Sequence, residues 1–598
     1  MAIRELHYCW KWRLQSPPET LWPLVSDTDR FNRDCGFPSV EVIRSGPDTR
    51  RLRARPAGIA VEWEERAFEW LAPQRFEVDR TYTRGPLAHL RIRCELESAA
   101  NNGTALTYQM WLEPAGLLGQ LTLPLAVGRW ARTRIQRVFR RYDELARCDA
   151  TPPRPAPPSS RPTRAVLARA ALEQAGQPRE LVDRLIAFVT QADDSSVARL
   201  RAYALADRWN VPRRTMLQLC LHATRAGLLD LRWETVCPHC RGATLTSGTL
   251  AGISAQAHCD SCAVDFVANF DRLLEITFAP NPAIRAVARP TYCVGGPQLT
   301  PHIVAQHRLA PGAAGTLALR VPPGRYRVRA PGLAEFRSFR IEPGAAPVGQ
   351  IALGVNPEGE PTLAPVTELT IVNHDATERI AIVEHTAWSD QSTTAAEVTA
   401  LQTFRDLFAR EALRPGEQLA AGALTLVFTD LKGSTQLYRE IGDAPALGRV
   451  LDHFDVLRAA VAAEGGAMVK AMGDAIMAVF PRPAPALRAL RAAQRRLASP
   501  ESGGATSLRP LALKAGLHHG PCLAINQNDR LDYFGSSVNF AAHLCPLATG
   551  ADLVLSDAVR SDPESAAFIE ENRLHATPEQ VSLRGFAGDS FTVWRVTD

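Results

Sequence analysis

Hydrophobic and polar positions follow different periods in successive parts of this 598-residue chain. Within residues 1–148, stretches such as 61–70 and 105–111 alternate between apolar and polar residues, and the segment 129–146 has one apolar side. Alternation with a period of two indicates half-buried strands, whereas an apolar stripe with a period of 3.6 indicates an amphipathic helix. The pattern therefore predicts an α+β domain that ends in a long basic helix.

The elements of this first domain are a short helix at 17–25, a curved antiparallel sheet and the long helix. This order resembles the START-like (SRPBCC) fold, which implies a cavity for a small hydrophobic ligand beneath the long helix. A solid-cored interaction domain would give the same pattern, so both interpretations stay open. A semi-rigid, proline-rich linker is predicted to follow at residues 149–163.

Residues 164–235 have a helical pattern, and residues 204–217 within them fit a helix, a turn and a second helix. The apolar stretch 228–233 fits the wing of a winged-helix DNA reader. Arginines are few here and form no base-reading pattern, and the net charge of the whole chain is only +5. We therefore favour a packing module over a nucleic-acid partner, and keep a DNA-binding regulator as the alternative.

Four of the 12 cysteines form two CxxC motifs, Cys237 with Cys240 and Cys259 with Cys262. Two such thiolate pairs can close a tetrahedral site that has no open position, which is typical of structural Zn²⁺. The region 236–272 is accordingly predicted to be zinc-ribbon-like, with a role in stability and none in chemistry.

Alternating strands punctuated by proline and glycine occupy 273–388 and predict an antiparallel β-sandwich. From 389 to 417 the pattern returns to a helical period, with an apolar stripe that runs from Val398 to Phe408. We expect a connecting helix here, which either packs on the sandwich or carries a signal or a dimer contact.

The C-terminal part, 418–598, opens with a short apolar run that reads as a buried strand. Its predicted order is strand, helix, hairpin, helix and strand, at 424–429, 445–463, 467–480, 483–497 and 510–517. This order fits a ferredoxin-like βαββαβ core with additional elements. The whole chain is thus expected to be a multidomain α+β protein.

Two carboxylates lie at the ends of these strands, Asp430 after the first strand and Asp474 in the turn of the hairpin. Gly433, Ser434 and Thr435 open the helix that follows Asp430. Hard divalent cations prefer carboxylate oxygen, and the free N–H groups of a helix N-terminus favour phosphate. The sequence therefore predicts a site that holds divalent metal and a triphosphate together.

Four ordered motifs, at 428–435, 470–474, 532–535 and 538–543, resemble the class III adenylate/guanylate cyclase catalytic domain. The resemblance implies conversion of ATP to 3′,5′-cyclic AMP and pyrophosphate with two Mg²⁺ or Mn²⁺ ions in each active site. It assigns the metals to Asp430 and Asp474, and the backbone carbonyl of Leu431 could add a ligand.

By the same resemblance, Lys470 and Asp532 read the purine. A lysine donor toward N1 and a carboxylate that accepts from the N6 amine favour adenine, because guanine presents an acceptor at O6 and a proton at N1. Asn539 is expected to orient the ribose, and Lys514 stands where related domains carry a phosphate-contacting arginine. ATP is therefore favoured as the substrate, with a guanylate cyclase as the alternative.

One position departs from the family: His543 stands where the family has an arginine that stabilises negative charge in the transition state. Loss of one such donor typically costs about 10²–10³ in rate. Either the enzyme works slowly or uses a nearby group such as Arg530, or the domain is a non-catalytic nucleotide-binding signalling protein. We favour the enzyme, because both metal aspartates and the purine pair are present.

In the family, the metal residues of one chain face the purine residues of another, so the resemblance implies a head-to-tail homodimer. The upstream domains are then expected to be regulatory sensors. Hydrophobic residues form 46% of the chain and charged residues 22%, as in ordinary soluble proteins. The first residues lack an apolar signal-peptide core and no stretch reads as a membrane span, so a cytoplasmic location is expected.

Overall fold

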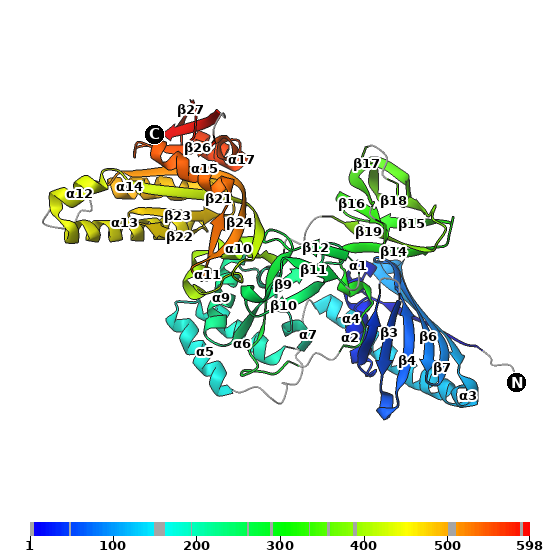
Figure 1. Ribbon diagram of the computed structural model, residues 1–598. Helices are drawn as coiled ribbons and strands as arrows, with labels where there is room; N and C mark the ends of the chain where they lie inside the picture. The colour runs from blue at the N-terminus through cyan, green and yellow to red at the C-terminus, as the bar shows by residue number, and fades with distance from the viewer. Residues whose placement is uncertain are drawn as a thin grey trace.

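The structure is a computed structural model, and Figure 1 shows its course from the N-terminal domain to the C-terminal domain. The residues it describes are 5–46, 49–148, 162–192, 194–259, 262, 264–287, 291–333, 335–355, 359–386, 391–499, 510–586 and 590–598. Most of the predicted linker at 149–163 lies outside the described residues, since only Pro162 and Thr163 of it are included, in a helix. No helix in the described part of the chain has the length and apolar character needed to cross a membrane.

The N-terminal domain is a curved antiparallel sheet with helices against one face. Its strands are β1 (Leu6–Leu14), β2 (Val40–Ser45), β3 (Thr49–Ala54), β4 (Val61–Arg66), β5 (Glu69–Leu71), β6 (Arg75–Arg84), β7 (Leu87–Ala99) and β8 (Gly103–Pro114). Its helices are α1 (Pro18–Val25), α2 (Thr28–Asp34), α3 (Gly116–Leu125) and α4 (Arg132–Cys148). The predicted α+β order, with a long last helix, agrees with these elements.

Aromatic side chains occupy the space between α4 and the sheet. The ring of Phe139 on α4 lies 5.1 Å from the ring of Phe31, 5.5 Å from Trp12 and 5.8 Å from Tyr108, centroid to centroid. Ring pairs at these separations contribute packing energy beyond the area they bury. The described side chains thus form a packed core in the place where the START-like resemblance predicted a ligand cavity.

The second group of strands continues the N-terminal sheet instead of forming a separate sandwich. It contains β14 (Ile303–Leu309), β15 (Ala314–Arg320), β16 (Gly324–Arg329), β17 (Arg337–Ala352), β18 (Thr362–Val372) and β19 (Arg379–His385). Strand β14 pairs with β5, so one 14-stranded sheet runs through both regions. Because β17 pairs first with β16 and then with β18, the sheet bends around a core that includes Tyr326 and Phe339.

The central region combines five helices and a small sheet. The helices are α5 (Pro162–Gln174), α6 (Arg179–Gln191), α7 (Asp194–Val197), α8 (Ala202–Trp209) and α9 (Arg213–Arg225). The sheet has the order β10 (Ala243–Ser247), β9 (Leu229–Val236), β13 (Leu274–Pro280) and β20 (Thr393–Thr394), and β11 (Gln256–Cys259) pairs with β12 (Val264–Val267). The predicted sandwich boundary at 273 was therefore wrong, because β13 pairs with β9 and β20 of this sheet.

The helix–turn–helix pattern is real, but α9 is not available to a DNA groove. Most of the circumference of this helix is covered by other parts of the protein. The buried residues of α9 are those at 216, 217, 219, 220, 221 and 223. Arg214 donates to the backbone carbonyls of Ala462 and Ala463 in the C-terminal domain. The structure thus supports the packing module and contradicts the DNA-reading alternative for this helix.

The predicted connecting helix at 389–417 is replaced by two short helices, α10 (Ala395–Thr399) and α11 (Gln402–Leu407). A capping box between Thr394 and Glu397 starts α10. Leu401 is extended, with φ −93° and ψ 129°, and this interrupts the helix. Apolar periodicity did not reveal the break, because residues on both sides of it are buried.

The C-terminal domain has the predicted ferredoxin-like core. Its first elements are β21 (Gln418–Leu431), α12 (Ser434–Ile441), α13 (Asp443–Ala463), β22 (Ala467–Met472), β23 (Ala475–Phe480), α14 (Pro483–Ala498) and β24 (Leu513–Gln527). It continues with β25 (Arg530–Phe534), α15 (Ser536–Leu544), β26 (Leu553–Ser556), α16 (Asp557–Arg560), α17 (Pro563–Glu571), β27 (His575–Val581) and β28 (Phe591–Thr597). The sheet order is β22-β23-β21-β24-β26-β28-β27, and β25 pairs only with β24.

Candidate active site

Asp430 and Asp474 lie at the same edge of the C-terminal sheet. Strands β21 and β23 pair up to Thr429 opposite Ile476, so the residues that follow Thr429 and precede Ile476 are neighbours. Gly473 allows the tight turn between β22 and β23 because its φ is +69°. The structure thus brings together the two carboxylates that the motifs singled out.

The charges of these two carboxylates are incompletely balanced by the protein. Burial raises the pKa of Asp430 above its ordinary value, the negative charge of Asp474 adds to this, and Lys514 acts in the opposite direction. The Oδ2 atom of Asp474 is buried and has no hydrogen-bond partner among the residues that the structure describes. A buried anionic oxygen without a partner is costly, so this pair is suited to a bound cation.

Lys514 lies beside the metal side of the site. It is the cross-strand partner of Asp430 in the β21–β24 ladder. The resemblance had placed a phosphate-contacting residue at this position, and the register adds that its charge also offsets that of Asp430. The strand pairing that produces this contact spans more than 80 positions of sequence, so the motifs alone did not indicate it.

Gly433 precedes α12 in the left-handed region, with φ +73° and ψ 25°, so that Ser434 and Thr435 begin the helix. Gln436 and Leu437 both donate their backbone N–H groups to the carbonyl of Gly433. The earlier N–H groups of the helix remain at its positive end, where anions are stabilised. The turn and the helix N-terminus therefore have the predicted arrangement next to Asp430.

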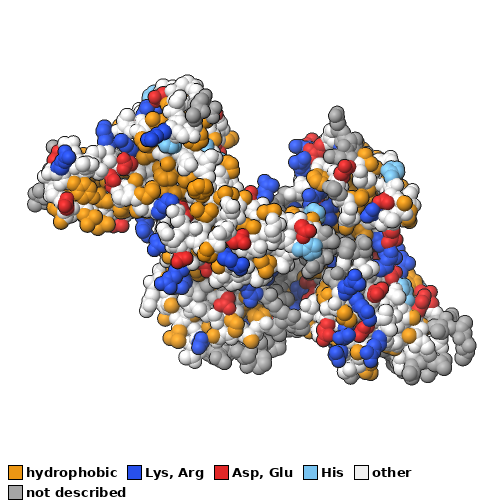
Figure 2. Space-filling view, in the orientation of Figure 1, with side chains coloured by type: hydrophobic (Ala, Val, Ile, Leu, Met, Phe, Trp, Pro, Cys, Tyr) orange, Lys and Arg blue, Asp and Glu red, His pale blue; other side chains and the backbone are white. Residues whose placement is uncertain are grey.

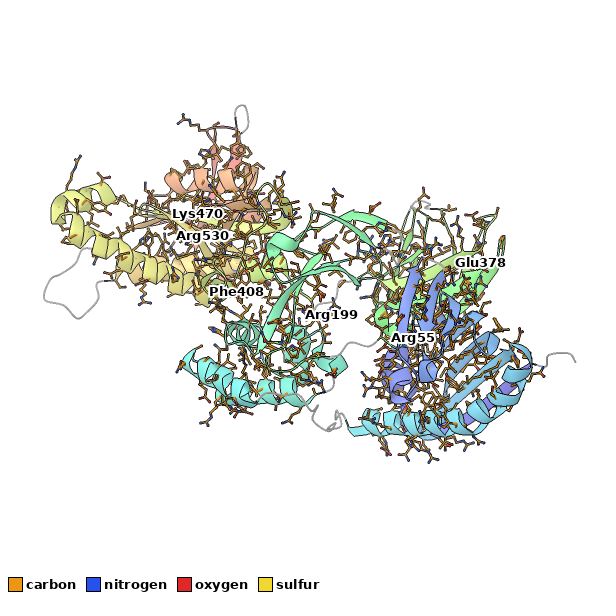
Figure 3. All side chains as sticks on the ribbon, turned by 60° about the horizontal axis from the view of Figure 1, so that its bottom comes forward. Arg55, Arg199, Glu378, Phe408, Lys470 and Arg530 are labelled. Atoms are coloured by element: carbon orange, nitrogen blue, oxygen red, sulfur yellow. The ribbon has the colours of Figure 1, made fainter. Side chains whose placement is uncertain are left out.

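Lys470 and Asp532 form an ion pair within one chain (Figure 3 labels Lys470). The Nζ atom of Lys470 donates to Oδ2 of Asp532 over 2.5 Å. Oδ1 of Asp532 accepts a hydrogen bond from the backbone N–H of Tyr533 over 2.8 Å, and Asp532 as a whole is 5% exposed. The two residues predicted to read the purine are thus in contact, although they are 62 positions apart.

Helix α15 carries Asn539 and His543 one turn apart. Residues four positions apart lie on the same helix face, so both side chains project from one side of α15. Asn539 is exposed, and the ring of His543 lies 6.3 Å from that of Phe586 in an edge-to-face arrangement. His518 on β24 packs against Phe540 of the same helix, with the ring centroids 4.6 Å apart.

The four motif cysteines converge in space. The Sγ atoms of Cys237, Cys240, Cys259 and Cys262 all lie within 4.8 Å of one another, and those of Cys240 and Cys259 are 3.7 Å apart. A tetrahedral zinc site with Zn–S bonds of about 2.3 Å would separate its sulfur atoms by about 3.8 Å. The cluster is thus of the size that the CxxC motifs predict.

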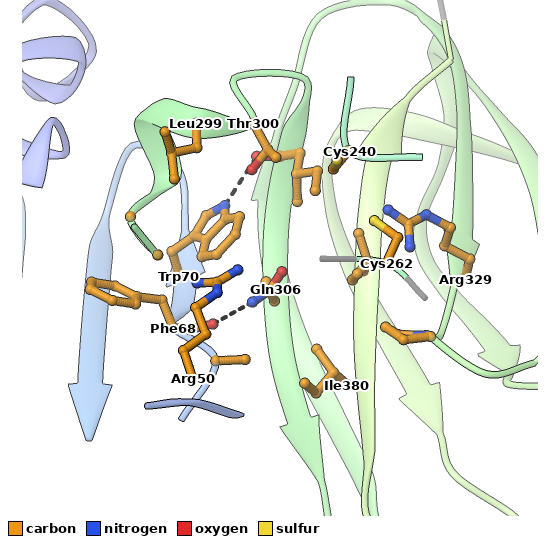
Figure 4. A pocket seen from close by; sticks show the side chains of 16 residues that line it. Arg50, Phe68, Trp70, Cys240, Cys262, Leu299, Thr300, Gln306, Arg329 and Ile380 are labelled. Carbon is orange, nitrogen blue, oxygen red and sulfur yellow. Dashed lines mark hydrogen bonds between the residues drawn. The ribbon is translucent and has the colours of Figure 1, made fainter. Parts of the chain in front are cut away.

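A small cavity lies at the seam between the N-terminal sheet and its continuation (Figure 4). Its volume is about 80 Å³, and its lining includes Arg50, Arg329 and Cys262. Trp70 donates through Nε1 to the carbonyl of Ile303 over 3.0 Å, and Gln306 donates to the carbonyl of Phe68 over 2.6 Å. No residue of α4 lines this cavity, so it is not the ligand cavity that was predicted beneath the long helix of the first domain.

Residues 418–585 match the family described as the adenylate and guanylate cyclase catalytic domain. The C-terminal domain is thus similar to the catalytic domains of nucleotide cyclases. Residues 163–291 match a second family, DUF5939, which is described as a family of unknown function. The cyclase match confirms the resemblance that the four motifs carried, and it bears out the prediction of an adenylate/guanylate cyclase enzyme domain.

Two named adenylate cyclases are also similar to part of this chain. An adenylate cyclase of Neurospora crassa is 34% identical over 153 residues, which cover 23% of this chain and 7% of that protein. A pH-sensitive adenylate cyclase of Mycobacterium tuberculosis is 31% identical over 195 residues, which cover 31% of this chain and 45% of that protein. The chain thus spans less than half the length of these relatives.

Two solved structures are also similar to part of this chain. The adenylyl cyclase CyaB from P. aeruginosa is 21% identical, with a TM-score of 0.26, and the match covers 30% of this chain and 96% of that one. The guanylyl cyclase Cya2 is 22% identical, with a TM-score of 0.24, over 30% of this chain and 93% of that one.

The motifs did not reveal the residues that support the cyclase domain from outside. Thr399, Gln402 and Arg405 precede the domain and contact the strands that carry Lys470 and Asp532. These three residues are polar or charged within an apolar helical pattern, which is the one signal by which they could have been noticed.

Proposed function

We propose that this protein is an adenylate cyclase that converts ATP to 3′,5′-cyclic AMP and pyrophosphate at a homodimer interface. The observation that carries the proposal is the 2.5 Å contact between Lys470 and Asp532, a donor and an acceptor on separate strands. Lys470 can donate to N1 of adenine, while Asp532 accepts from the N6 amine. Guanine would place a proton at N1 and an acceptor at O6, which mismatches both residues.

Two Mg²⁺ or Mn²⁺ ions fit the residues at the other side of the site. Asp430 and Asp474 offer hard oxygen ligands, and the carbonyl of Leu431 is a further candidate ligand. Within the described part of the chain, Oδ2 of Asp474 has no hydrogen-bond partner. When bound, the ions would stabilise charge on the attacking and leaving oxygens. The protein itself contributes the charge of Lys514 and the N–H groups of Gly433, Ser434 and Thr435 for the phosphates.

Asn539 would orient the ribose from α15, where it is exposed toward any bound nucleotide. His543 lies one turn further on the same helix and occupies the place of the family's transition-state arginine. A neutral imidazole is a weaker partner for developing negative charge than a guanidinium. His543 therefore favours one alternative function, a nucleotide-binding signalling protein with slow or no turnover. If the protein is an active enzyme, Arg530 is the other cation that could stabilise the transition state.

Exposed apolar side chains beside the purine pair support the homodimer. Met472 follows Lys470 by two positions and is 43% exposed, and Phe534 follows Asp532 by two positions and is 58% exposed. Residues two apart on a strand share a face, so each apolar side chain lies on the side of its neighbouring polar residue. Leu447 and Leu451 on α13 are each 53% exposed, and Figure 2 shows hydrophobic side chains gathered over α12 and α13.

Turnover of ATP tests the proposed reaction. Purified full-length protein with Mn²⁺ and ATP should form cyclic AMP, measured by chromatography and mass spectrometry. At equal concentrations of the two nucleotides, it should turn over ATP faster than GTP. Asp430→Asn should abolish turnover, whereas Asp443→Asn, which removes a carboxylate from the exposed start of α13, should not. Activity untouched by Asp430→Asn would contradict the metal assignment.

His543→Arg separates the enzyme from the alternative function. If the wild type is a slow enzyme, the arginine variant should be faster by up to about 10²-fold. If wild-type protein binds ATP without turnover and only the variant forms cyclic AMP, the signalling alternative is correct.

We further propose that Cys237, Cys240, Cys259 and Cys262 hold a structural Zn²⁺ ion. Metal analysis of the purified protein should give one zinc per chain, and Cys259→Ser should lower both zinc content and melting temperature. Cys9→Ser is the matched control because Cys9 is exposed and lies outside the cluster. Full zinc content in the Cys259→Ser protein would exclude this site.

A further inference from the structure

The two strands that carry the purine pair are not joined to each other in the sheet. Strand β22, with Lys470, is at one edge, and β25, with Asp532, pairs only with β24. Strands β23, β21 and β24 lie between them in the order of the ladder. The contact between Lys470 and Asp532 therefore depends on something other than a shared ladder of backbone hydrogen bonds.

Arg405 of α11 holds strand β25 from outside the domain. Its Nη1 atom donates to the carbonyl of Leu531 over 3.1 Å, and its Nε atom donates to the carbonyl of Thr399 over 2.9 Å. Its guanidinium also lies 5.5 Å from the centre of the Tyr533 ring. Leu531 and Tyr533 are the two neighbours of Asp532, so this arginine contacts the backbone of one neighbour and the side-chain ring of the other.

Thr399 completes the contact with β25. Its Oγ1 atom lies 3.0 Å from the hydroxyl of Tyr533, and both residues are buried. The backbone N–H of Tyr533 in turn donates to Oδ1 of Asp532. Tyr533 thus connects the end of α10, through its hydroxyl, with the carboxylate that faces Lys470, through its backbone N–H.

Gln402 makes the matching contact with β22. Its Oε1 atom accepts the backbone N–H of Met468 over 2.9 Å, and its own N–H donates to the carbonyl of Gly466 over 3.2 Å. Gln402 is 8% exposed, so these bonds are shielded from water. Within a span of seven residues, 399–405, one segment is hydrogen-bonded to both purine strands.

We propose that Thr399, Gln402 and Arg405 are positioning residues that hold Lys470 against Asp532 and thereby set the preference for adenine. The proposal rests on the proposed function. None of the three residues touches the nucleotide in this scheme, since each acts through the backbone or side chains of β22 and β25. Selectivity for the purine is then determined in part by residues that precede the catalytic domain.

The same segment is bonded to the central region, so this region can influence the purine pair. The ring of Phe404 lies 5.8 Å from that of Trp233 on β9, and Ala396 donates to the carbonyl of Phe270 over 3.0 Å. Glu411 accepts the backbone N–H of Leu250 over 2.9 Å, and Leu250 lies between the two cysteine pairs. The central region also contacts the catalytic domain directly, since the N–H of Phe270 donates to the carbonyl of Ala420 on β21 over 2.8 Å.

The test measures the affinity of the full-length protein for ATP and for GTP by competition against a fluorescent nucleotide, in Ca²⁺ to bind nucleotide with reduced turnover. Thr399→Val and Arg405→Lys should each lower the ratio of ATP to GTP affinity by about tenfold, the size of one neutral hydrogen bond. Thr399→Ser keeps the hydroxyl and should retain the wild-type ratio. Arg458→Gln is the matched control, because Arg458 pairs with Asp406 of α11 from α13 and not with either purine strand.

A second measurement separates positioning from a loss of folding. In a background of Asp532→Asn, Arg405→Lys should change the ratio no further, because the carboxylate through which it acts is gone. Tyr533→Phe provides the same break as Thr399→Val if that protein is poorly folded. Additive effects of Arg405→Lys and Asp532→Asn would overturn the proposal.

The measured ratio of ATP to GTP affinity distinguishes an error in the positioning role from an error in the proposed function. Wild-type protein that binds ATP in preference to GTP, with the same ratio in the Thr399→Val and Arg405→Lys variants, would overturn the positioning role alone. Wild-type protein that binds neither nucleotide, or shows no preference, would overturn the purine assignment and this inference together.

Discussion

The two halves of the cyclase site are built in opposite ways. On the purine side, Lys470 and Asp532 satisfy each other, and hydrogen bonds from residues before the domain support them. On the metal side, burial and the charge of Asp474 raise the pKa of Asp430, and Oδ2 of Asp474 has no hydrogen-bond partner among the described residues. The protein thus completes the first half by itself, whereas the second half is left to be completed by what it binds.

This difference separates stability from activity. A group that the protein already pairs contributes to folding, and its removal leaves a buried partner unsatisfied. A group left unpaired contributes little to folding and can even oppose it, so its removal should affect mainly the reaction. Substitutions of the same chemical type, Asp to Asn, should therefore act differently in the two halves.

The largest effect is expected for Asp474→Asn. The substitution removes a negative charge beside Asp430 and a buried oxygen that has no partner, so we expect no loss of melting temperature without divalent metal. Turnover should fall by at least about a hundredfold, because metal ligation supplies several kcal/mol of transition-state stabilisation. Scanning calorimetry and the cyclic AMP assay measure the two effects on the same protein.

A fall in melting temperature for Asp474→Asn as large as that for a paired carboxylate would contradict the contrast between the halves. Asp443→Asn, at the exposed start of α13, controls for the change in net charge. Addition of Mn²⁺ should raise the melting temperature of the wild type and not that of Asp474→Asn.

Asp532→Asn should have the next largest effect, and unlike Asp474→Asn it should lower the stability of the protein. The amide cannot neutralise Lys470, whose side chain is 35% exposed, so the free energy of unfolding should fall by about 1 kcal/mol. The preference for ATP should also fall, since an amide can present a donor as well as an acceptor to the purine. Urea unfolding followed by fluorescence and competitive nucleotide binding measure both changes.

Unchanged urea unfolding in the Asp532→Asn protein would show that the ion pair adds no stability and that the purine half is no more complete than the metal half. Asp529→Asn is the control, because Asp529 precedes the same strand and its side chain is exposed.

The sequence allowed the ends of elements to be predicted better than the contacts between them. Asp430 and Asp474 were located because turn residues and strand ends are encoded within a few positions, and the sheet edge follows from the βαββαβ order. The register that places Lys514 opposite Asp430, and the pairing of β14 with β5, join distant segments. An alternating pattern indicates which face of a strand is buried but not which strand lies beside it.

The segment before the cyclase domain shows the same limit. Its apolar stripe predicted one helix, but the structure has two, because Leu401 is extended and lets the N–H of Gln402 reach the carbonyl of Gly466. That hydrogen bond is made to another domain, so the helix propensities of the neighbouring residues cannot predict it. The polar residues Thr399, Gln402 and Arg405 would have been read as a solvated face, although Thr399 and Gln402 are buried.

The smallest predicted effect concerns pH and the helix α15, which carries Asn539 and His543. His518 packs beneath this helix against Phe540, and burial, with a smaller contribution from His519, lowers the pKa of His518 from 6.5 to about 4. The unfolded chain therefore binds a proton near pH 6.5 that the folded chain does not. The stabilisation is present above pH 6.5 and is lost as the pH falls toward 4.

We expect the free energy of unfolding to fall by about 1–3 kcal/mol from this residue between pH 6.5 and 4. His518→Leu should reduce the slope of stability against pH in this window, while His575→Leu, on the exposed start of β27, should leave it unchanged. Urea unfolding at a series of pH values measures the slope independently of any change in absolute stability. An identical slope in His518→Leu and wild type would mean that acid weakens the packing of α15 through other groups, and that this helix is not held by a neutral histidine.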